Sequence, residues 1–98
     1  MKTIYLSGPM TGIKDNNYPW FNEVADKLKS QGYSVLNPAV IKLHPQAEWK
    51  DYMRQAITML CAADEIYMLE GWENSQGAQV EHNLAKILEM KIRHEVEK

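Results

Sequence analysis

Short apolar runs alternate with segments whose apolar residues recur at helical spacing along the whole chain of 98 residues. This strand–helix alternation is typical of a parallel sheet with helices on both faces, and right-handed crossovers leave it few topologies. We therefore expect a single α/β domain over residues 1–98, with a small parallel sheet of about four strands in the order 2-1-3-4. The expected strands are Thr3–Leu6, Tyr33–Leu36, Ile66–Leu69 and Met90–Ile92.

Three amphipathic helices are expected between these strands. Pro19 suits the first turn of the first helix, with Asn16 and Asn17 before it as caps and Gly32 at its end. A second helix should span residues 48–62, and a third follows the loop after the third strand. The residues expected to pack on the sheet are Trp20, Phe21, Val24, Ala25 and Leu28 in the first helix, Trp49, Met53, Ala56, Ile57, Leu60 and Cys61 in the second, and Val80, Leu84, Ile87 and Leu88 in the third.

The composition argues against several classes of protein. The formal net charge is −2 at pH 7, without the basic stripe that binding to a nucleic acid requires. No apolar run approaches the ~18 residues of a membrane span, and Met1–Leu6 is too short for a signal peptide. His44 has no second histidine or cysteine at metal-ligand spacing. We expect a cytoplasmic protein with neither metal nor cofactor and, because so small a domain leaves much surface exposed, a homodimer or higher homo-oligomer.

Two polar loops should meet at one edge of this sheet. Ser7–Gly12 follows the first strand and Glu70–Gly77 follows the third, and both contain glycines and short polar side chains. In the 2-1-3-4 order the switch point lies between the first and third strands, where ligands bind in open α/β sheets. Glu81 follows in the first turns of the third helix, where the helix dipole and free N–H groups favour an ionised carboxylate. Simple stabilisation of the helix is the alternative explanation of its position.

A helix-held carboxylate beside such loops suits a ribosyl compound as ligand. The anomeric carbon of a sugar gains oxocarbenium character as its bond to a base breaks, and an ionised carboxylate such as Glu81 attacks it or stabilises its charge. Backbone N–H groups with Thr11 or Ser75 are expected to hold a 5′-phosphate, although neither a dinucleotide fingerprint nor a Walker motif is present. Trp72 either stacks on the base or covers the sheet edge, and Ser75 either contacts the ligand or only caps the helix.

A departing base usually needs a proton, so a general acid is expected. Asp64 opens the third strand at the end of the sheet far from the cleft, and we expect it to be structural. Glu70 and Glu73 are the better-placed carboxylates.

Three segments of the chain, Tyr5–Gly12, Gly71–Ala78 and Glu81–Ala85, resemble the small nucleoside 2-deoxyribosyltransferase-like domains that are frequent in bacteriophage genomes. The resemblance covers nearly the whole chain, and the pairing of Ser-Gly-Pro-Met-Thr-Gly with Gly-Trp-Glu-x-Ser-x-Gly-Ala is specific. It implies a flavodoxin-like three-layer α/β/α fold. It also implies cleavage or transfer at the N-glycosidic bond of a nucleoside or of a deoxynucleoside 5′-monophosphate.

The resemblance implies roles for individual residues as well. Glu81, four residues after Gly77, matches the family's nucleophile, and Tyr5 matches the tyrosine that orients it. Ser75 matches the serine with which the monophosphate hydrolases contact phosphate, where the transferases have an aspartate. A small-molecule nucleotide or nucleoside is therefore the expected partner. The residues expected to bind it are Ser7, Gly8, Pro9, Met10, Thr11, Gly12, Gly71, Trp72, Glu73, Asn74, Ser75 and Gly77.

One position departs from the family pattern. Ala56 stands where the relatives carry a catalytic aspartate on the preceding helix, and Arg54 or Glu73 would have to substitute for it. This departure favours a rival function, a nucleotide-binding module that has lost turnover and acts as a sensor or sequestering protein. The presence of Glu81 and Tyr5 favours the enzyme. A purely structural subunit would leave the two polar loops unexplained.

Overall fold

The computed structural model describes residues 2–96, and its sheet confirms the expected α/β class. All neighbouring strands are parallel, in the order β2-β1-β3-β4. The central strand β1 therefore pairs with β2 on one side and with β3 on the other. The strands are β1 (Thr3–Ser7), β2 (Ser34–Leu36), β3 (Glu65–Met68) and β4 (Lys91–His94).

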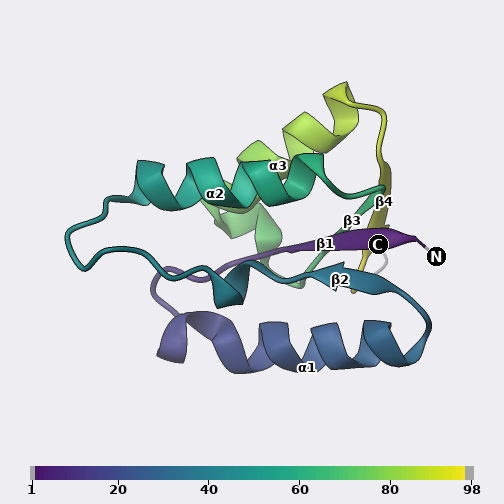
Figure 1. Cartoon of the computed structure of the whole chain (residues 1–98), viewed down its shortest axis with the longest axis horizontal. Helices are drawn as coiled ribbons and strands as arrows, with labels where there is room; N and C mark the ends of the chain where they lie inside the picture. Colours follow the sequence, from purple (N-terminus) through teal and green to yellow (C-terminus); the bar gives the residue numbers. More distant parts are fainter. Residues whose placement is uncertain (1, 97–98) are drawn as a thin grey trace.

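Helices cover both faces of the sheet and make it the middle of three layers. Helix α1 (Tyr18–Ser30) lies on one face, whereas α2 (Trp49–Cys61) and α3 (Gln76–Ile87) lie together on the other (Figure 1). Short 3-10 turns precede or follow them at η1 (Lys14–Asn17), η2 (Pro38–Val40) and η3 (Trp72–Asn74). No helix within residues 2–96 is both long enough and apolar enough to span a bilayer.

The start of α1 differs in part from expectation. Pro19 occupies the first turn, as its missing N–H favours. Neither Asn16 nor Asn17 caps the helix with its side chain, and both have a positive φ, of 52° and 61°. The Asn17 side-chain amide instead donates to the Pro9 carbonyl oxygen at 2.9 Å. This asparagine thus ties the loop after β1 to the start of α1.

Two clusters of buried side chains form the core, one on each face of the sheet. Alternate residues of β1 belong to different clusters, because successive strand side chains point to opposite faces. Ile4 and Leu6 pack with α1, and Tyr5 packs with α2 and α3. Ala56 is fully buried in the second cluster, so its position on α2 is part of the core.

The inward face of α3 is made of small residues, which corrects the expected face. Ala78 and Ala85 are buried and Leu84 packs partly buried against the same cluster, as expected, whereas Val80, Ile87 and Leu88 are 37%, 65% and 50% exposed. Small side chains let the helix lie close to the sheet, which leaves the larger apolar residues on the outer side. Cys61, expected in the core, is also exposed, because α2 ends there.

The amino edge of the sheet is held by carboxylates with backbone and ionic partners. The Asp64 carboxylate accepts from the Thr3 N–H at 3.0 Å, which confirms its structural role. Next to it, the nearly buried Glu65 pairs with Arg93 of β4 at 2.5 Å. The first contact joins β1 to the start of β3, and the second joins β3 to β4. Both carboxylates lie at the end of the sheet opposite the polar loops.

Candidate active site

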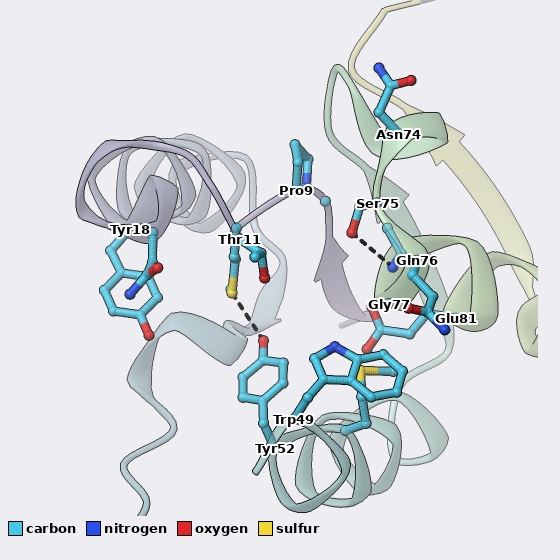
Figure 2. Close-up of a pocket in the computed structure, with 15 residues that line it drawn as sticks. Pro9, Thr11, Tyr18, Trp49, Tyr52, Asn74, Ser75, Gln76, Gly77 and Glu81 are labelled. Carbon is cyan, nitrogen blue, oxygen red and sulfur yellow. Dashed lines mark hydrogen bonds between the residues drawn. The ribbon is translucent and has the colours of Figure 1, made fainter. Parts of the chain in front are cut away.

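A cavity of about 510 Å³ opens at the carboxyl edge of the sheet, beside the end of β1. The loop after β1 forms one wall, the start of α3 a second, and the first turns of α2 a third (Figure 2). The two polar loops therefore converge as the strand order predicts. The lining residues are Gly8, Pro9, Met10, Thr11, Asn16, Tyr18, Trp49, Tyr52, Met53, Asn74, Ser75, Gln76, Gly77, Ala78 and Glu81.

Glu81 lies at the floor of this cavity and is held by two hydroxyl groups from β1. Tyr5 donates to its Oε2 at 2.6 Å, and Ser7 donates to its Oε1 at 2.7 Å. Both donors are almost completely buried, and Glu81 itself is 5% exposed. Because residues two apart on a strand point to the same face, Tyr5 and Ser7 reach the same carboxylate. Each carboxylate oxygen thus has a fixed donor, and the side chain has one defined orientation.

The sequence placed Ser7 in the loop, where its contact with Glu81 could not be foreseen. In the structure β1 continues through Ser7, and the side chain points inward beside Tyr5. Extending the expected strand by one residue, to Ser7, would have placed Tyr5 and Ser7 on the same face of the sheet, because side chains two residues apart on a strand point the same way.

Burial raises the pKa of Glu81 from 4.5 to about 7, and the hydrogen bonds from Tyr5 and Ser7 lower it in part. The dipole argument expected a carboxylate that favours its ionised form. Glu81 lies in the second turn of α3, which begins at Gln76, and loss of water there outweighs the nearby positive helix end. Glu81 therefore exchanges its proton near neutral pH, as a reactive acid or base does.

Gly8 and Gly77 bring elements close together at the cavity, and neither needs an unusual backbone conformation to do so. A Cβ on Gly8 would lie 2.7 Å from the Leu69 Cβ, and one on Gly77 would lie 3.1 Å from the Met53 Sδ. Gly8 therefore lets the loop after β1 pack against the end of β3. Gly77 lets α3 approach α2. The sequence predicted that these glycines let the backbone approach a ligand closely. In the structure they let it approach Leu69 and Met53 closely.

Ser75 caps α3, which is one of the two roles expected for it. Its Oγ accepts from the Ala78 N–H at 3.2 Å, and it also lines the cavity. A hydroxyl that accepts one hydrogen bond still has its own proton to donate. Capping and contact with a ligand are thus compatible at this residue.

Five residues of the expected binding set do not line the cavity: Ser7, Gly12, Gly71, Trp72 and Glu73. Ser7 lies behind the lining, where it holds Glu81. Gly71 has a φ of 87° and begins the 3-10 turn η3, which carries Trp72 away from the cavity. The Trp72 ring stacks on His82 with 4.3 Å between centroids and 23° between planes, and His94 lies beyond it. This placement supports the alternative in which Trp72 covers the sheet edge.

The aromatic wall of the cavity comes instead from α2. Trp49 is 48% exposed, and Trp49, Tyr52 and Met53 all line the cavity from the first turns of that helix. The sequence assigned Trp49 and Met53 to the core-facing stripe, which is confirmed for the buried Met53 and wrong for Trp49. Helical spacing identifies such a stripe but not the point at which the helix passes beyond the sheet edge. The sequence did contain a signal for this aromatic wall: Trp49 and Tyr52 stand three positions apart in the first turn of the helix.

Tyr52 is half-buried, with its ring against the core and its hydroxyl in the cavity. That hydroxyl donates to the Met10 Sδ at 3.1 Å (Figure 2). Burial raises the pKa of Tyr52 above its usual 10, and the negative charge of Glu81 raises it further. Tyr52 thus keeps its proton and lies within the field of the Glu81 carboxylate.

Neither residue considered as a substitute for the missing aspartate reaches the cavity. Arg54 is exposed on α2 and Glu73 lies outside the lining. Glu81 is the one acidic residue among the described residues that line the cavity. Groups of three histidine, cysteine or carboxylate side chains that could hold a metal ion are absent from residues 2–96. His44 is exposed and accepts from the Gln46 N–H.

Comparison with known proteins gives a family but no function. No curated protein matches this chain. A family model described as a domain of unknown function, DUF4406, matches residues 2–94, which include every element of the sheet and the whole cavity lining. The chain therefore belongs to the DUF4406 family.

Proposed function

We propose that this protein cleaves or transfers at the N-glycosidic bond of a nucleoside 5′-monophosphate, with Glu81 as the nucleophile. The observation that carries the proposal is the Glu81 carboxylate itself, buried at the floor of a cavity and held by Tyr5 and Ser7. A carboxylate in this position has the fixed geometry that attack on an anomeric carbon requires. The resemblance to the deoxyribosyltransferase-like domains supports the same reaction.

The raised pKa of Glu81 fits a covalent mechanism. Near pH 7 a large share of the side chain is ionised, since its pKa is about 7. A carboxylate with little water around it is a stronger nucleophile and pairs more strongly with a developing oxocarbenium ion. Tyr5 and Ser7 keep both carboxylate oxygens oriented during attack.

The start of α3 is the proposed site for the 5′-phosphate. The first N–H groups of a helix have no partner inside the helix, and the helix dipole favours an anion there. Ser75, Gln76 and Gly77 bring such groups to the cavity wall. Among the described residues that line the cavity, none is a lysine or arginine. A phosphate would therefore be held by neutral donors, with Thr11 opposite.

Trp49 takes the place of Trp72 as the proposed platform for the base. Its indole ring is half exposed and lies at the cavity mouth, across from Ser75 and Gly77 (Figure 2). Exposed tryptophan surface next to a polar cavity suits the flat apolar face of a nucleobase. The chain would then bind the sugar over Glu81, between the platform and the phosphate site.

The test is incubation with a panel of deoxyribonucleoside and ribonucleoside 5′-monophosphates, with free base followed by chromatography. An added acceptor base in a parallel set separates transfer from hydrolysis. Release from one monophosphate that is lost in Glu81→Ala supports the proposal. Absence of release from every monophosphate, with and without acceptor, contradicts it.

A second candidate function is nucleotide binding without turnover. The supporting observation is the fully buried Ala56, which leaves Glu81 without a second acidic residue among the described cavity residues. Such a protein would act as a sensor or would sequester its ligand. Tight binding of one monophosphate in calorimetry, with no base released, would favour this candidate over the enzyme.

We also propose that the protein forms a homodimer through the outer face of α3. Val80, Ile87 and Leu88 are all exposed on this helix, with Leu84 half-buried between them. Exposed apolar side chains in one stripe are typical of a surface that another chain covers. A second copy of the same stripe is self-complementary about a two-fold axis.

A further inference from the structure

The cavity holds one acidic nucleophile, and the proposed reaction also needs a proton. The departing base takes the electron pair of the glycosidic bond. Unless it gains a proton it leaves as an anion, and such an anion is a poor leaving group. No second carboxyl group lines the cavity among residues 2–96. The donor must therefore be one of the neutral hydroxyl groups in the lining.

Four of the described lining residues carry a hydroxyl group, Thr11, Tyr18, Tyr52 and Ser75, and Tyr52 is the one that lies on the same helix as Trp49, the proposed platform for the base. The Tyr52 hydroxyl donates to the thioether sulfur of Met10, which is a weak acceptor. Ser75 keeps a proton to donate, but it lies at the start of α3, the proposed phosphate site, across the cavity from Trp49. A phenol that donates only to a thioether exchanges that partner readily for a ring nitrogen of a bound base, which is a far better acceptor. Met10 also lines the cavity and is the more flexible of the two side chains.

The position of Tyr52 on α2 supports the same conclusion. Residues four apart share a helix face, so Tyr52 lies one turn before Ala56 on the side that faces the sheet. Ala56 is fully buried, whereas the Tyr52 ring packs on the same core cluster and its hydroxyl extends into the cavity. The ring is therefore held firmly while its polar end meets the ligand. Trp49, the proposed platform for the base, lies about one turn earlier on the same helix.

We propose that Tyr52 is the catalytic proton donor to the departing base. This assignment rests on the proposed function. In the first step a Glu81 carboxylate oxygen bonds to the anomeric carbon, the bond from that carbon to the base nitrogen breaks, and its electron pair stays on the base. The Tyr52 hydroxyl proton passes to the base, which leaves a phenolate. In the second step water attacks the anomeric carbon, gives its proton to the phenolate, and releases Glu81 as a carboxylate.

The charges in this sequence help the transfer. The negative charge of Glu81 is one reason why the pKa of Tyr52 is raised, and burial is the larger one. Glu81 becomes a neutral ester as it bonds to the sugar. The repulsion that opposes a phenolate therefore disappears in the same step in which Tyr52 gives up its proton. One negative charge moves across the cavity and none is added.

The test uses Tyr52→Phe, which keeps the packed ring and removes only the hydroxyl. Two substrates are compared: the nucleoside 5′-monophosphate that the wild-type protein cleaves, and the nitrophenyl glycoside 5′-monophosphate of the same sugar, whose leaving group departs without a proton. We expect kcat for the nucleotide to fall by about 10²- to 10⁴-fold and kcat for the nitrophenyl compound to stay as in the wild type. The matched control is Tyr18→Phe, a second phenol in the same lining, which should leave the ratio of the two rates unchanged.

The possible results separate the two proposals. Equal losses on both substrates would overturn the role as donor and make Tyr52 a structural residue. An unchanged rate on the nucleotide would overturn it as well. Turnover of the nitrophenyl compound also shows that the variant is folded. A wild-type protein that releases nothing from either substrate would overturn the proposed function, and the role of Tyr52 with it.

Discussion

The Tyr5 hydroxyl donates to Glu81 Oε2 at 2.6 Å, although the two residues are 76 positions apart in the sequence. This hydrogen bond joins the central strand β1 to helix α3 and helps to set the orientation and the pKa of the Glu81 carboxylate. Burial raises the pKa of Glu81, and the bonds from Tyr5 and Ser7 hold it near 7. Without its two donors, the pKa of Glu81 would be higher and a smaller share of the side chain would be ionised at neutral pH.

Glu81→Ala should abolish turnover and leave nucleotide affinity largely intact. The carboxylate is the proposed nucleophile, and its removal should lower kcat by about four orders of magnitude or more. Base release and calorimetry on the same preparation measure the two effects. Glu70→Gln is the matched control, because Glu70 is an exposed carboxylate of the same loop region. Base release by Glu81→Ala at the wild-type rate would disprove the assigned role.

The stability of the protein should fall as the pH rises from 4.5 to about 7. Glu81 binds its proton more tightly in the folded state, so the unfolded state holds fewer protons in this window and unfolding becomes easier as pH rises. A shift of the pKa from 4.5 to about 7 corresponds to on the order of 3 kcal/mol. Glu81→Gln should lack this loss. The free energy of unfolding of Glu81→Gln minus that of the wild type, both measured in urea, should therefore increase by this amount from pH 4 to pH 8.

The same comparison with Glu23→Gln is the control. Glu23 is an exposed carboxylate on α1 that does not line the cavity, so Glu23→Gln serves as a charge-matched substitution away from the site. A constant difference for Glu81→Gln would show instead that Glu81 has an ordinary pKa in the folded protein.

Tyr5→Phe should move the acidic limb of the activity profile to higher pH. The Tyr5 hydroxyl lowers the pKa of Glu81, so its loss raises that pKa above about 7, and a higher pH is needed to ionise the nucleophile. Ser7→Ala should shift the limb in the same direction. The measurement is kcat/KM against pH. Tyr67→Phe, on the other face of β3, should leave the limb in place, and a limb that stays in place in Tyr5→Phe would refute the effect.

Trp49→Ala should weaken nucleotide binding, whereas Trp72→Ala should not. Stacking of a base on Trp49 would contribute about 1–3 kcal/mol to binding. Trp72 packs on His82 outside the cavity, so its loss should lower the melting temperature and leave affinity unchanged. Calorimetry and thermal melts of both variants measure this. The reverse pattern would restore Trp72 as the platform.

Light scattering should give a mass of twice the 11.3 kDa of one chain. Leu88→Glu should convert the protein to a monomer, because a charge would be buried in the proposed α3 interface. Val40→Glu is the control, since Val40 is 64% exposed but lies on η2, away from this helix. A wild-type monomer would exclude the interface.

The fold could be predicted because each of its elements has a local pattern. Strands and helices differ in period, Pro19 and Gly32 mark the ends of α1, and right-handed crossovers then restrict the strand order. The pairing of Tyr5 with Glu81 could be predicted from the resemblance, because both residues lie in its matching segments.

The remainder depends on how elements pack, which the pattern of one element does not contain. Val80, Ile87 and Leu88 have helical spacing, but Ala78 and Ala85 give closer approach to the sheet and so are the buried face. The place of Trp49 depends in the same way on where α2 extends past the sheet. Local periodicity does not record that position.

The central place of β1 has a consequence for how the protein is made. Within this domain, β1 is synthesised before the two strands with which it pairs, Ser34–Leu36 and Glu65–Met68. Its inward hydroxyl groups then have to wait for α3, because Glu81 is their partner. Contacts between residues so distant in sequence form slowly, because the entropy of closing a long loop is lost before the contacts stabilise the chain. On the ribosome, the cavity should therefore form only after α3 has emerged, and a product truncated before α3 would lack Glu81 and one wall of the cavity.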